Sequence, residues 1–578
     1  MKIRLLAART FAMMAAPLLA GACAAVPAQA PQPASSAPAL YPDGMVSAAD
    51  PRAADAGAAM LRQGGSATDA AIATMLALTV VEPQSSGIGG GGFYVTADAA
   101  GHVSTIDGRE TAPASATQDW FVKDGKVLTF AEAVPGGTSI GVPGNLALAA
   151  RAHAAHGKLA WKALFAPAIA LAKNGFEVTP RLYGMLKTSS NTAAFTPAGK
   201  ALFYGADGNP RPVGTRIVNT ALAATLEKLA SGGRPAFYAG ANAAAVAAAA
   251  RSAPINPSSM TQADIASYVA KPRDAVCGTY RGYRICGMGP PSSGATTVLA
   301  TLGALERFDI GKLGPDSPVA WHLIAESMRL AYADRAKYLA DADFESVPVA
   351  GLVDKGYLAS RSALIDPART IPAVDAGTPP GAKTAYAPAP AQVENGTSHF
   401  VTVDRAGNVV TYTSTIESPF GSGMMAGGYY LNNELTDFDM APTVGGVPVA
   451  NRPGPGKRPR SSMAPTLVYG PDGALRLAVG AAGGATIPAQ VLRAIIGVID
   501  WNLSAQAAID LPVLFAPTGD TVFVEKGSRL EALIPALTQL GHKVMPRELP
   551  LKANAIEVVG GRLVGAADPR SEGRAVAE

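Results

Sequence analysis

A proline-rich segment ends at Gly396, where two runs of alternating apolar and polar residues begin. The segment 378–392 has the composition of an exposed linker. The runs Phe400–Asp404 and Val409–Thr415 enclose a short polar connection. Because a period of two is typical of strands, this pattern predicts a β-hairpin that opens at Thr397, directly after the linker.

Thr397 has a chemical option at the start of such a strand. Attack of its hydroxyl on the Gly396 carbonyl, followed by hydrolysis, would cut the chain and make Thr397 a new N-terminus. An N-terminal amine can act as the base for a threonine nucleophile, so no histidine is needed. Glycine before the threonine suits a peptide that is strained or closely approached, because it has no side chain. The alternative interpretation is that Thr397 merely begins a strand, where β-branched residues are favoured.

Composition excludes several classes of protein. The chain has 578 residues, of which 48% are hydrophobic and 16% charged, so we expect a packed globular protein with two or more lobes. The net charge is +4 and the basic residues are dispersed, so no nucleic-acid partner is predicted. The six histidines show no metal-ligand spacing and there is no Cys-x-x-Cys, so we expect no metal and no cofactor.

The N-terminus has the features of an export signal. Lys2 and Arg4 precede an apolar run over 11–20, and Ala28–Ala30 offers small residues for cleavage. Residues 1–30 are therefore predicted to be a signal peptide, which places the mature protein in the periplasm or outside the cell. Leu19–Cys23 also resembles a bacterial lipoprotein box, in which Cys23 would carry a lipid anchor. Both interpretations stay open, with plain export favoured, and no other stretch is predicted to span a bilayer.

Cys277 and Cys286 flank residues 278–285, which are predicted to form two short strands about a turn. Export to an oxidising compartment favours a disulfide across this hairpin. Two buried free thiols are the alternative.

Between residues 140 and 350, apolar residues recur with helical spacing in alanine-rich runs. Helices are predicted over Asn145–His156, Trp161–Lys173, Ala221–Leu229 and Val319–Leu339. The turn Met288–Gly294 is predicted to cap a helix that begins near Ala295. After Thr397 the sequence changes to short strands and glycine turns, with helices near Ala485–Trp501 and Leu530–Leu540. Strands enclosed by helices in both halves predict a layered α+β fold.

Several short motifs occur in a fixed order on both sides of Thr397. They are Val81–Gly92, Gly108–Pro113, Phe420–Gly423, Leu431–Phe438, Lys457–Met463, Gly480–Gly484 and Ala567–Ser571. Each motif alone is typical of a turn or a cap. As an ordered set from about Ala49 to Ser571, they resemble those of the γ-glutamyltranspeptidase (γ-glutamyltransferase) family.

The resemblance implies a fold and a processing event. The family has the N-terminal-nucleophile hydrolase fold, an αββα sandwich, and is made as a precursor that cuts itself. The matching cut lies between Gly396 and Thr397. It would give a large subunit, 31–396, ending in the proline-rich linker, and a small catalytic subunit, 397–578, which together form a heterodimer.

The resemblance also implies the reaction. Thr397 would form a γ-glutamyl-enzyme ester from glutathione or another γ-glutamyl compound. Water, or an acceptor amino acid or peptide, would then release the glutamyl group. Thr415 matches the family's second threonine, which hydrogen-bonds near the nucleophile. Gly483 and Gly484 match the oxyanion hole, whose N–H groups would stabilise the tetrahedral intermediate.

The substrate-binding positions follow from the same resemblance. Arg109 and two serines match the positions that hold the glutamyl α-carboxylate, a task that suits a bidentate arginine. Two acids match the positions that bind the α-amino group, since carboxylates accept hydrogen bonds from an ammonium. The serines are Ser461 and Ser462, and the acids are Glu434 and Asp437.

Two features depart from the family pattern. Glu417 stands where the family often has an asparagine that contacts the substrate amino group, and a third acid there would shift a pKa or alter the substrate preference. The segment Phe438–Gly456 is rich in Pro and Gly and lacks the aromatic residue often found in the family's lid loop. A more open lid would admit water, so we expect hydrolysis to compete with transfer.

Two other functions stay open. An acylase for glutaryl or β-lactam side chains would share the fold, but Glu434 and Asp437 together favour a substrate with an α-amine. An uncleaved, non-catalytic periplasmic binding protein that keeps the pocket belongs to a different class. The presence of Thr397 together with Gly483 and Gly484 counts against it.

Overall fold

The computed structural model describes residues 39–383, 386–389, 396–517 and 519–578. The predicted signal peptide with Cys23, and part of the predicted linker, lie outside the described residues. Residues Ala39–Glu578 form one compact unit, so the expectation of two or more lobes is wrong. The reason is that strands from both ends of the chain share the same sheets.

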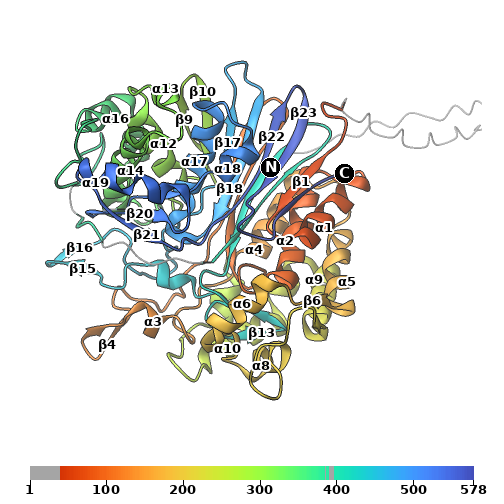
Figure 1. Ribbon diagram of the computed structural model, residues 1–578. Coiled ribbons are helices and arrows are strands. Elements are labelled where there is room, and N and C mark those ends of the chain that lie inside the picture. The colour runs from red at the N-terminus through yellow and green to blue at the C-terminus, as the bar shows by residue number, and fades with distance from the viewer. Residues whose placement is uncertain (1–38, 384–385, 390–395, 518) are drawn as a thin grey trace, which may run out of the picture. The chain divides into compact units, whose positions relative to one another are not determined.

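Two antiparallel sheets lie between two groups of helices (Figure 1). The first sheet has the strand order β24 (Arg574–Ala577), β1 (Met45–Ala48), β11 (Ser398–Val403), β12 (Val409–Thr415), β2 (Gly91–Ala97), β3 (Val103–Gly108) and β8 (Lys271–Arg273). The second has the order β23 (Arg562–Ala567), β22 (Lys552–Val559), β18 (Leu475–Ala482), β17 (Thr466–Tyr469), β10 (Tyr283–Gly287) and β9 (Val276–Tyr280). The predicted α+β sandwich is therefore confirmed.

The first sheet interleaves strands from before and after residue 396. The hairpin β11–β12 is the one predicted from the alternating pattern. It lies in the middle of the sheet, where β11 pairs with β1 and β12 pairs with β2. Phe400 lies opposite Ala48, and Thr413 lies opposite Phe93. The two parts of the chain on either side of residue 396 are thus joined by continuous backbone hydrogen bonding.

Strand β11 is buried on both faces. Two of its polar residues, Ser398 and Thr402, do not face solvent but bind helix α2 (Ala67–Val81) and the residue that follows it. Ser398 Oγ donates to the carboxylate of Glu82, the residue after the helix, at 2.5 Å. Thr402 Oγ1 donates to the Ala67 carbonyl at 2.7 Å. The polar half of the alternation therefore anchors the strand to both ends of one buried helix.

Alanine-rich helices form the two outer layers (Figure 1). On the side of the first sheet lie α1 (Pro51–Arg62), α2, α4 (Asn145–His156), α5 (Ala166–Asn174) and α9 (Thr220–Tyr238). On the side of the second lie α12 (Gly294–Leu305), α14 (Pro318–Tyr338), α17 (Ile487–Ile499) and α18 (Ala505–Asp510). Helix α4 has the predicted bounds. None of the helices in the described part of the chain has the length and apolar character needed to cross a membrane.

Two local predictions can be compared with the structure. Helix α12 begins at Gly294, and the Ser292 hydroxyl of the predicted turn accepts a hydrogen bond from the Gly294 N–H at 3.0 Å. The N-cap residue itself, Ser293, does not cap the helix, because its hydroxyl donates to the Ser461 carbonyl at 2.7 Å. The helix predicted over Ala221–Leu229 continues to Tyr238, with a kink at Gly233.

The predicted hairpin around residues 278–285 is formed by β9 and β10. Cys277 and Cys286 lie directly opposite each other on the two strands, with their Cα atoms 4.1 Å apart. They are joined by a disulfide and are not two free thiols.

Gly480 on β18 tests the packing between the sheets. A Cβ at Gly480 would lie 2.3 Å from the imidazole of His399 on β11. We therefore expect Gly480→Ala to lower the free energy of unfolding by about 1–3 kcal/mol, the usual cost of overpacking. The control is Gly184→Ala in helix α6 (Pro180–Thr188), where a Cβ meets no atom within 4 Å. That variant should gain up to about 1 kcal/mol. If Gly480→Ala and the parent had equal free energies of unfolding in urea, this packing would be contradicted.

Candidate active site

One narrow pocket gathers ten of the positions singled out in the sequence. Its lining includes Arg109, Gly396, Thr397, Thr415, Glu417, Glu434, Asp437, Ser461, Ser462 and Gly484. These residues come from the ends of β3, β11 and β12, from the short 3-10 helices η2 (Glu434–Asp437) and η3 (Gly484–Thr486), and from the loop that carries Ser461 and Ser462. The free volume is only about 10 Å³. The pocket is filled by its own charged side chains, which pair with one another.

Thr397 has an unusual backbone conformation. Its φ is 95°, in the left-handed region that β-branched residues rarely adopt. Its hydroxyl donates to Thr415 Oγ1 at 3.1 Å, and its N–H donates to the Ser85 carbonyl at 3.1 Å. A residue held in such a region costs about 1–3 kcal/mol. The backbone of Thr397 is therefore strained where it follows Gly396. The two hydrogen bonds hold Thr397 in this conformation.

The Gly396 carbonyl accepts a hydrogen bond from the Gly483 N–H at 3.2 Å. No side chain fits at Gly396, because a Cβ would fall 1.5 Å from the carbonyl oxygen of Glu417. Gly483 has a φ of 122°, and its own Cβ would lie 1.9 Å from the Pro550 carbonyl oxygen. Gly483 lines the far side of Gly396, outside the pocket, whereas Gly484 lines the pocket itself.

Thr415 ends strand β12 and orients Thr397. Its oxygen accepts hydrogen bonds from the Thr397 hydroxyl and from the Glu417 N–H, the latter at 2.8 Å. Glu417 has a φ of 71°, so the chain turns sharply after the strand. Its carboxylate accepts hydrogen bonds from the Ser418 hydroxyl at 2.5 Å and from the Asn433 amide. The departure from the family pattern at Glu417 therefore places an acid directly in the pocket wall.

Arg109 is fully buried just after β3. Its two terminal nitrogens donate to the carboxylates of Glu434 and Asp437. Further hydrogen bonds run to the carbonyls of Pro459 at 3.1 Å and Arg460 at 2.8 Å. Burial raises the pKa of Glu434 well above its ordinary value, and the guanidinium opposes this shift. Each terminal nitrogen of the Arg109 guanidinium is thus paired with one acid.

Ser461 and Ser462 lie on a loop that is held from outside the pocket. The Ser461 N–H donates to the Pro291 carbonyl at 3.0 Å. The Ser462 hydroxyl accepts a hydrogen bond from Arg335 of α14 at 2.6 Å, and Arg335 also donates to Ser293 at 2.8 Å. Arg335 is a positioning residue that the sequence did not reveal, because it lies inside a long helix with no local motif.

Glu110 is a second residue that the sequence analysis missed. It lies next to Arg109 and is fully buried, and a Cβ on Gly91 would fall 2.4 Å from its carboxyl oxygen. Burial raises the pKa of Glu110 to about 8, although the Arg109 guanidinium opposes the shift. Its place inside the motif Gly108–Pro113 was the available signal.

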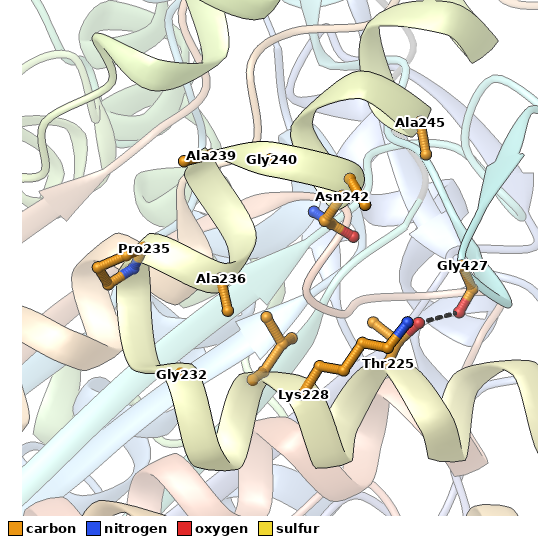
Figure 2. A pocket seen from close by; sticks show the side chains of 12 residues that line it. Thr225, Lys228, Gly232, Pro235, Ala236, Ala239, Gly240, Asn242, Ala245 and Gly427 are labelled. Atoms are coloured by element: carbon orange, nitrogen blue, oxygen red, sulfur yellow. Dashed lines mark hydrogen bonds between the residues drawn. The ribbon is translucent and has the colours of Figure 1, made fainter.

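A larger cavity lies away from this pocket, between α9, α10 (Gly240–Arg251) and the turn at Gly427 (Figure 2). Its volume is about 610 Å³, and the lining side chains are mostly small or apolar. Lys228 is the one charged residue among them, and Thr225 donates to the Gly427 carbonyl at 2.8 Å. The lining holds no acid and no histidine. Within the described ranges, no group of three His, Cys, Asp or Glu side chains is arranged to hold a metal ion.

The sequence and the fold both match known proteins over nearly the whole chain. A family model described as Gamma-glutamyltranspeptidase matches residues 53–578. The chain is 37% identical over 548 residues to the glutathione hydrolase proenzyme of Bacillus subtilis (strain 168), covering 92% of this chain and 91% of that one. It is 35% identical over 552 residues to the acylase ACY 1 proenzyme of Pseudomonas sp. (strain SE83), covering 93% and 94%. The crystal structure of cephalosporin acylase from Bacillus halodurans matches with a TM-score of 0.80 at 26% identity, covering 95% and 98%.

The raised pKa of Glu110 predicts a pH dependence of stability. Its folded value of about 8 lies above the ordinary 4.5, so the folded protein keeps a proton that the unfolded chain loses. The contribution of Glu110 to stability therefore falls as the pH rises from about 4.5 to about 8.

Glu110→Gln removes this titration. Between pH 5 and pH 8 we expect the unfolding free energy of the variant, relative to the parent, to rise by about 1 kcal/mol or more, since one pKa unit is worth about 1.4 kcal/mol. Urea unfolding at both pH values measures this. The control is Glu132→Gln, because hydrogen bonds from Thr129 lower the pKa of Glu132 and its titration lies below this window. An identical pH dependence in parent and Glu110→Gln would contradict the assignment.

Proposed function

The chain belongs to the γ-glutamyltranspeptidase family, and we propose that it is a self-processing γ-glutamyltransferase and glutathione hydrolase. In this proposal a cut after Gly396 frees Thr397, which then carries the γ-glutamyl group as an ester. The observation that carries the proposal is the strained Thr397, with a φ of 95° and its hydroxyl bonded to Thr415. It lies in a pocket with a buried arginine and three acids.

The cut begins with attack of the Thr397 Oγ1 on the Gly396 carbonyl carbon. A C–O bond forms, the C–N bond to Thr397 breaks, and the hydroxyl proton passes to the departing nitrogen. Water then hydrolyses the ester, which leaves a carboxylate on Gly396 and restores the Thr397 hydroxyl beside a free amine. Two observations favour this step: breaking the peptide releases the backbone strain, and the Gly483 N–H is placed to stabilise charge on the Gly396 oxygen.

The two products of the cut would be the large subunit, 31–396, and the small subunit, 397–578. Strand pairing would hold them together, because β11 and β12 lie between β1 and β2 of the large subunit. The mature enzyme is then a heterodimer of its own cleavage products. We place it in the periplasm or outside the cell after loss of residues 1–30, with lipid attachment at Cys23 as the alternative.

A glutamyl head group suits the charges of this pocket. Arg109 pairs with Glu434 and Asp437 in the structure. An α-amino acid can bind between them, because its carboxylate can accept hydrogen bonds from the arginine guanidinium and its ammonium can donate to the two acids. Ser461 and Ser462 would add hydroxyl donors to the carboxylate. Arg109, Glu434 and Asp437 would then each keep a partner of opposite sign, which buried charges require.

Transfer would use the same groups again. The Thr397 amine takes the hydroxyl proton as Oγ1 attacks the donor's γ-carbonyl carbon, and it gives that proton to the leaving amine as the C–N bond breaks. The N–H groups of Gly483 and Gly484 would stabilise the oxyanion. Water, or the amine of an acceptor amino acid or peptide, then attacks the ester carbonyl. Its proton passes through the amine to Oγ1 as the C–O bond to Thr397 breaks.

A glutaryl or β-lactam acylase is the second candidate, because an acylase proenzyme and a cephalosporin acylase are among the similar proteins. A glutaryl chain has a carboxylate but no ammonium. Its carboxylate would bind Arg109, which would then no longer pair with Glu434 and Asp437. Because the glutaryl chain supplies no cation, these buried acids would be left without a partner, which is costly. An uncleaved binding protein is a candidate of another class, and it would run as a single chain on a denaturing gel.

Two donors that differ only in the α-amine separate the enzymatic functions. We expect kcat/KM for γ-glutamyl-4-nitroanilide to exceed that for glutaryl-4-nitroanilide at least about 100-fold, because hydrogen bonds to charged groups contribute about 1.5–3 kcal/mol each. In Asp437→Asn the γ-glutamyl value should fall about 10- to 100-fold, with the glutaryl donor as the internal control. A parent enzyme that prefers the glutaryl donor is an acylase, and the glutamyl proposal then fails.

A further inference from the structure

A second cavity of about 310 Å³ adjoins the candidate active site on the far side of Gly396. Gly396 lines both cavities and so forms the wall between them. The second cavity is bounded by α6, by the loop that follows α2, and by the beginning of β22.

The Gly396 carbonyl marks the place where a donor's reacting carbonyl would lie. It bonds to the Gly483 N–H, on the edge of the second cavity. In the cleaved enzyme this place is open to the donor. With the glutamyl head in the first pocket, the leaving amine has to point away from that pocket. That direction leads into the second cavity.

Arg181 of α6 gives the second cavity a cationic group with spare hydrogen-bonding capacity. Its Nε is buried and has no hydrogen-bond partner among the described residues. The Glu82 carboxylate lies 3.7 Å from this nitrogen, beyond hydrogen-bonding distance. The contact to Glu572 at 3.0 Å uses only the backbone N–H of Arg181. The rest of the Arg181 side chain is partly exposed and lines the cavity, so its terminal nitrogens can bind a carboxylate through two parallel hydrogen bonds.

Lys552 and Gln84 complete the chemistry of this cavity. The Lys552 ammonium donates to Glu82 at 2.8 Å and to the Ser85 hydroxyl at 3.3 Å. Arg181 and Lys552 thus lie beside the same acid, Glu82. Gln84 is only 3% exposed, and its side-chain oxygen has no hydrogen-bond partner in the described part of the chain. The cavity therefore offers a cation for a carboxylate and an acceptor for a peptide N–H.

We propose that Arg181 is a specificity-determining residue of this second cavity, where it binds the free C-terminal carboxylate of the leaving or accepting peptide. The inference rests on the proposed function, because it assigns the leaving peptide of the donor and the incoming acceptor peptide to one place. A dipeptide suits the subsite: its amine lies at the reacting carbonyl, its N–H can reach the Gln84 oxygen, and its carboxylate lies at Arg181. Acceptors whose carboxylate is blocked should bind poorly.

Matched substrates test the subsite in the active enzyme. Glycylglycine and glycylglycinamide are compared as acceptors, and γ-glutamyl-3-carboxy-4-nitroanilide and γ-glutamyl-4-nitroanilide as donors. In the parent we expect the carboxylate form of each pair to be favoured about 10-fold or more in kcat/KM. Arg181→Gln should remove most of that preference and leave hydrolysis of the uncharged anilide within about twofold. Arg181→Lys should retain part of the preference, and Lys187→Gln on the same helix should retain all of it.

A loss that is equal for all four substrates in Arg181→Gln would show a packing role for Arg181 and overturn the inference. Direct binding separates the subsite from the proposed reaction. In the Thr397→Ala protein, NMR titration should show glycylglycine binding about 10-fold more tightly than glycylglycinamide, and Arg181→Gln should abolish the difference. Equal binding of the two peptides would overturn the subsite even in a fully active enzyme. Absence of anilide hydrolysis together with selective binding would instead count against the proposed function alone.

Discussion

The position of strand β11 is the constraint on which the rest of the structure depends. It pairs with β1 and β12 in the middle of the first sheet, and both of its faces are buried. Its polar side chains, Ser398 and Thr402, bind the two ends of α2, so the strand can neither slip nor rotate. Thr397 is thereby fixed at a φ that its side chain disfavours, and the backbone of Glu417 approaches so closely that residue 396 has to be glycine.

The electrostatics of the pocket follow from burial. Arg109 is removed from water, so it requires carboxylates, and Glu434 and Asp437 provide them. These acids require a cation in turn, which is why we propose a ligand that carries both charges. Glu110 is buried beside Arg109, and burial raises its pKa to about 8, although the guanidinium opposes the shift.

Local patterns predicted much of this structure. The alternation after Thr397 gave the hairpin β11–β12, and apolar spacing gave α4, because both signals depend on neighbours in sequence. The strand order was not predictable in this way, since β11 pairs with β1 from the other end of the chain. Arg335 and Arg181 went unnoticed because an arginine in a helix has no local signature. Their importance comes from distant partners, a serine loop for one and a cavity beside Gly396 for the other.

Intact mass spectrometry of the purified protein, with Thr397→Ala measured beside it, tests the central claim most directly. That claim is that Thr397 becomes a free N-terminal nucleophile by attacking the peptide bond before it. The account predicts two chains for the parent, the smaller beginning at Thr397, and one uncut chain for Thr397→Ala. A parent that stays whole, or a variant that is cut at the same bond, would contradict the account. In either case Thr397 would not be the group that processes the chain.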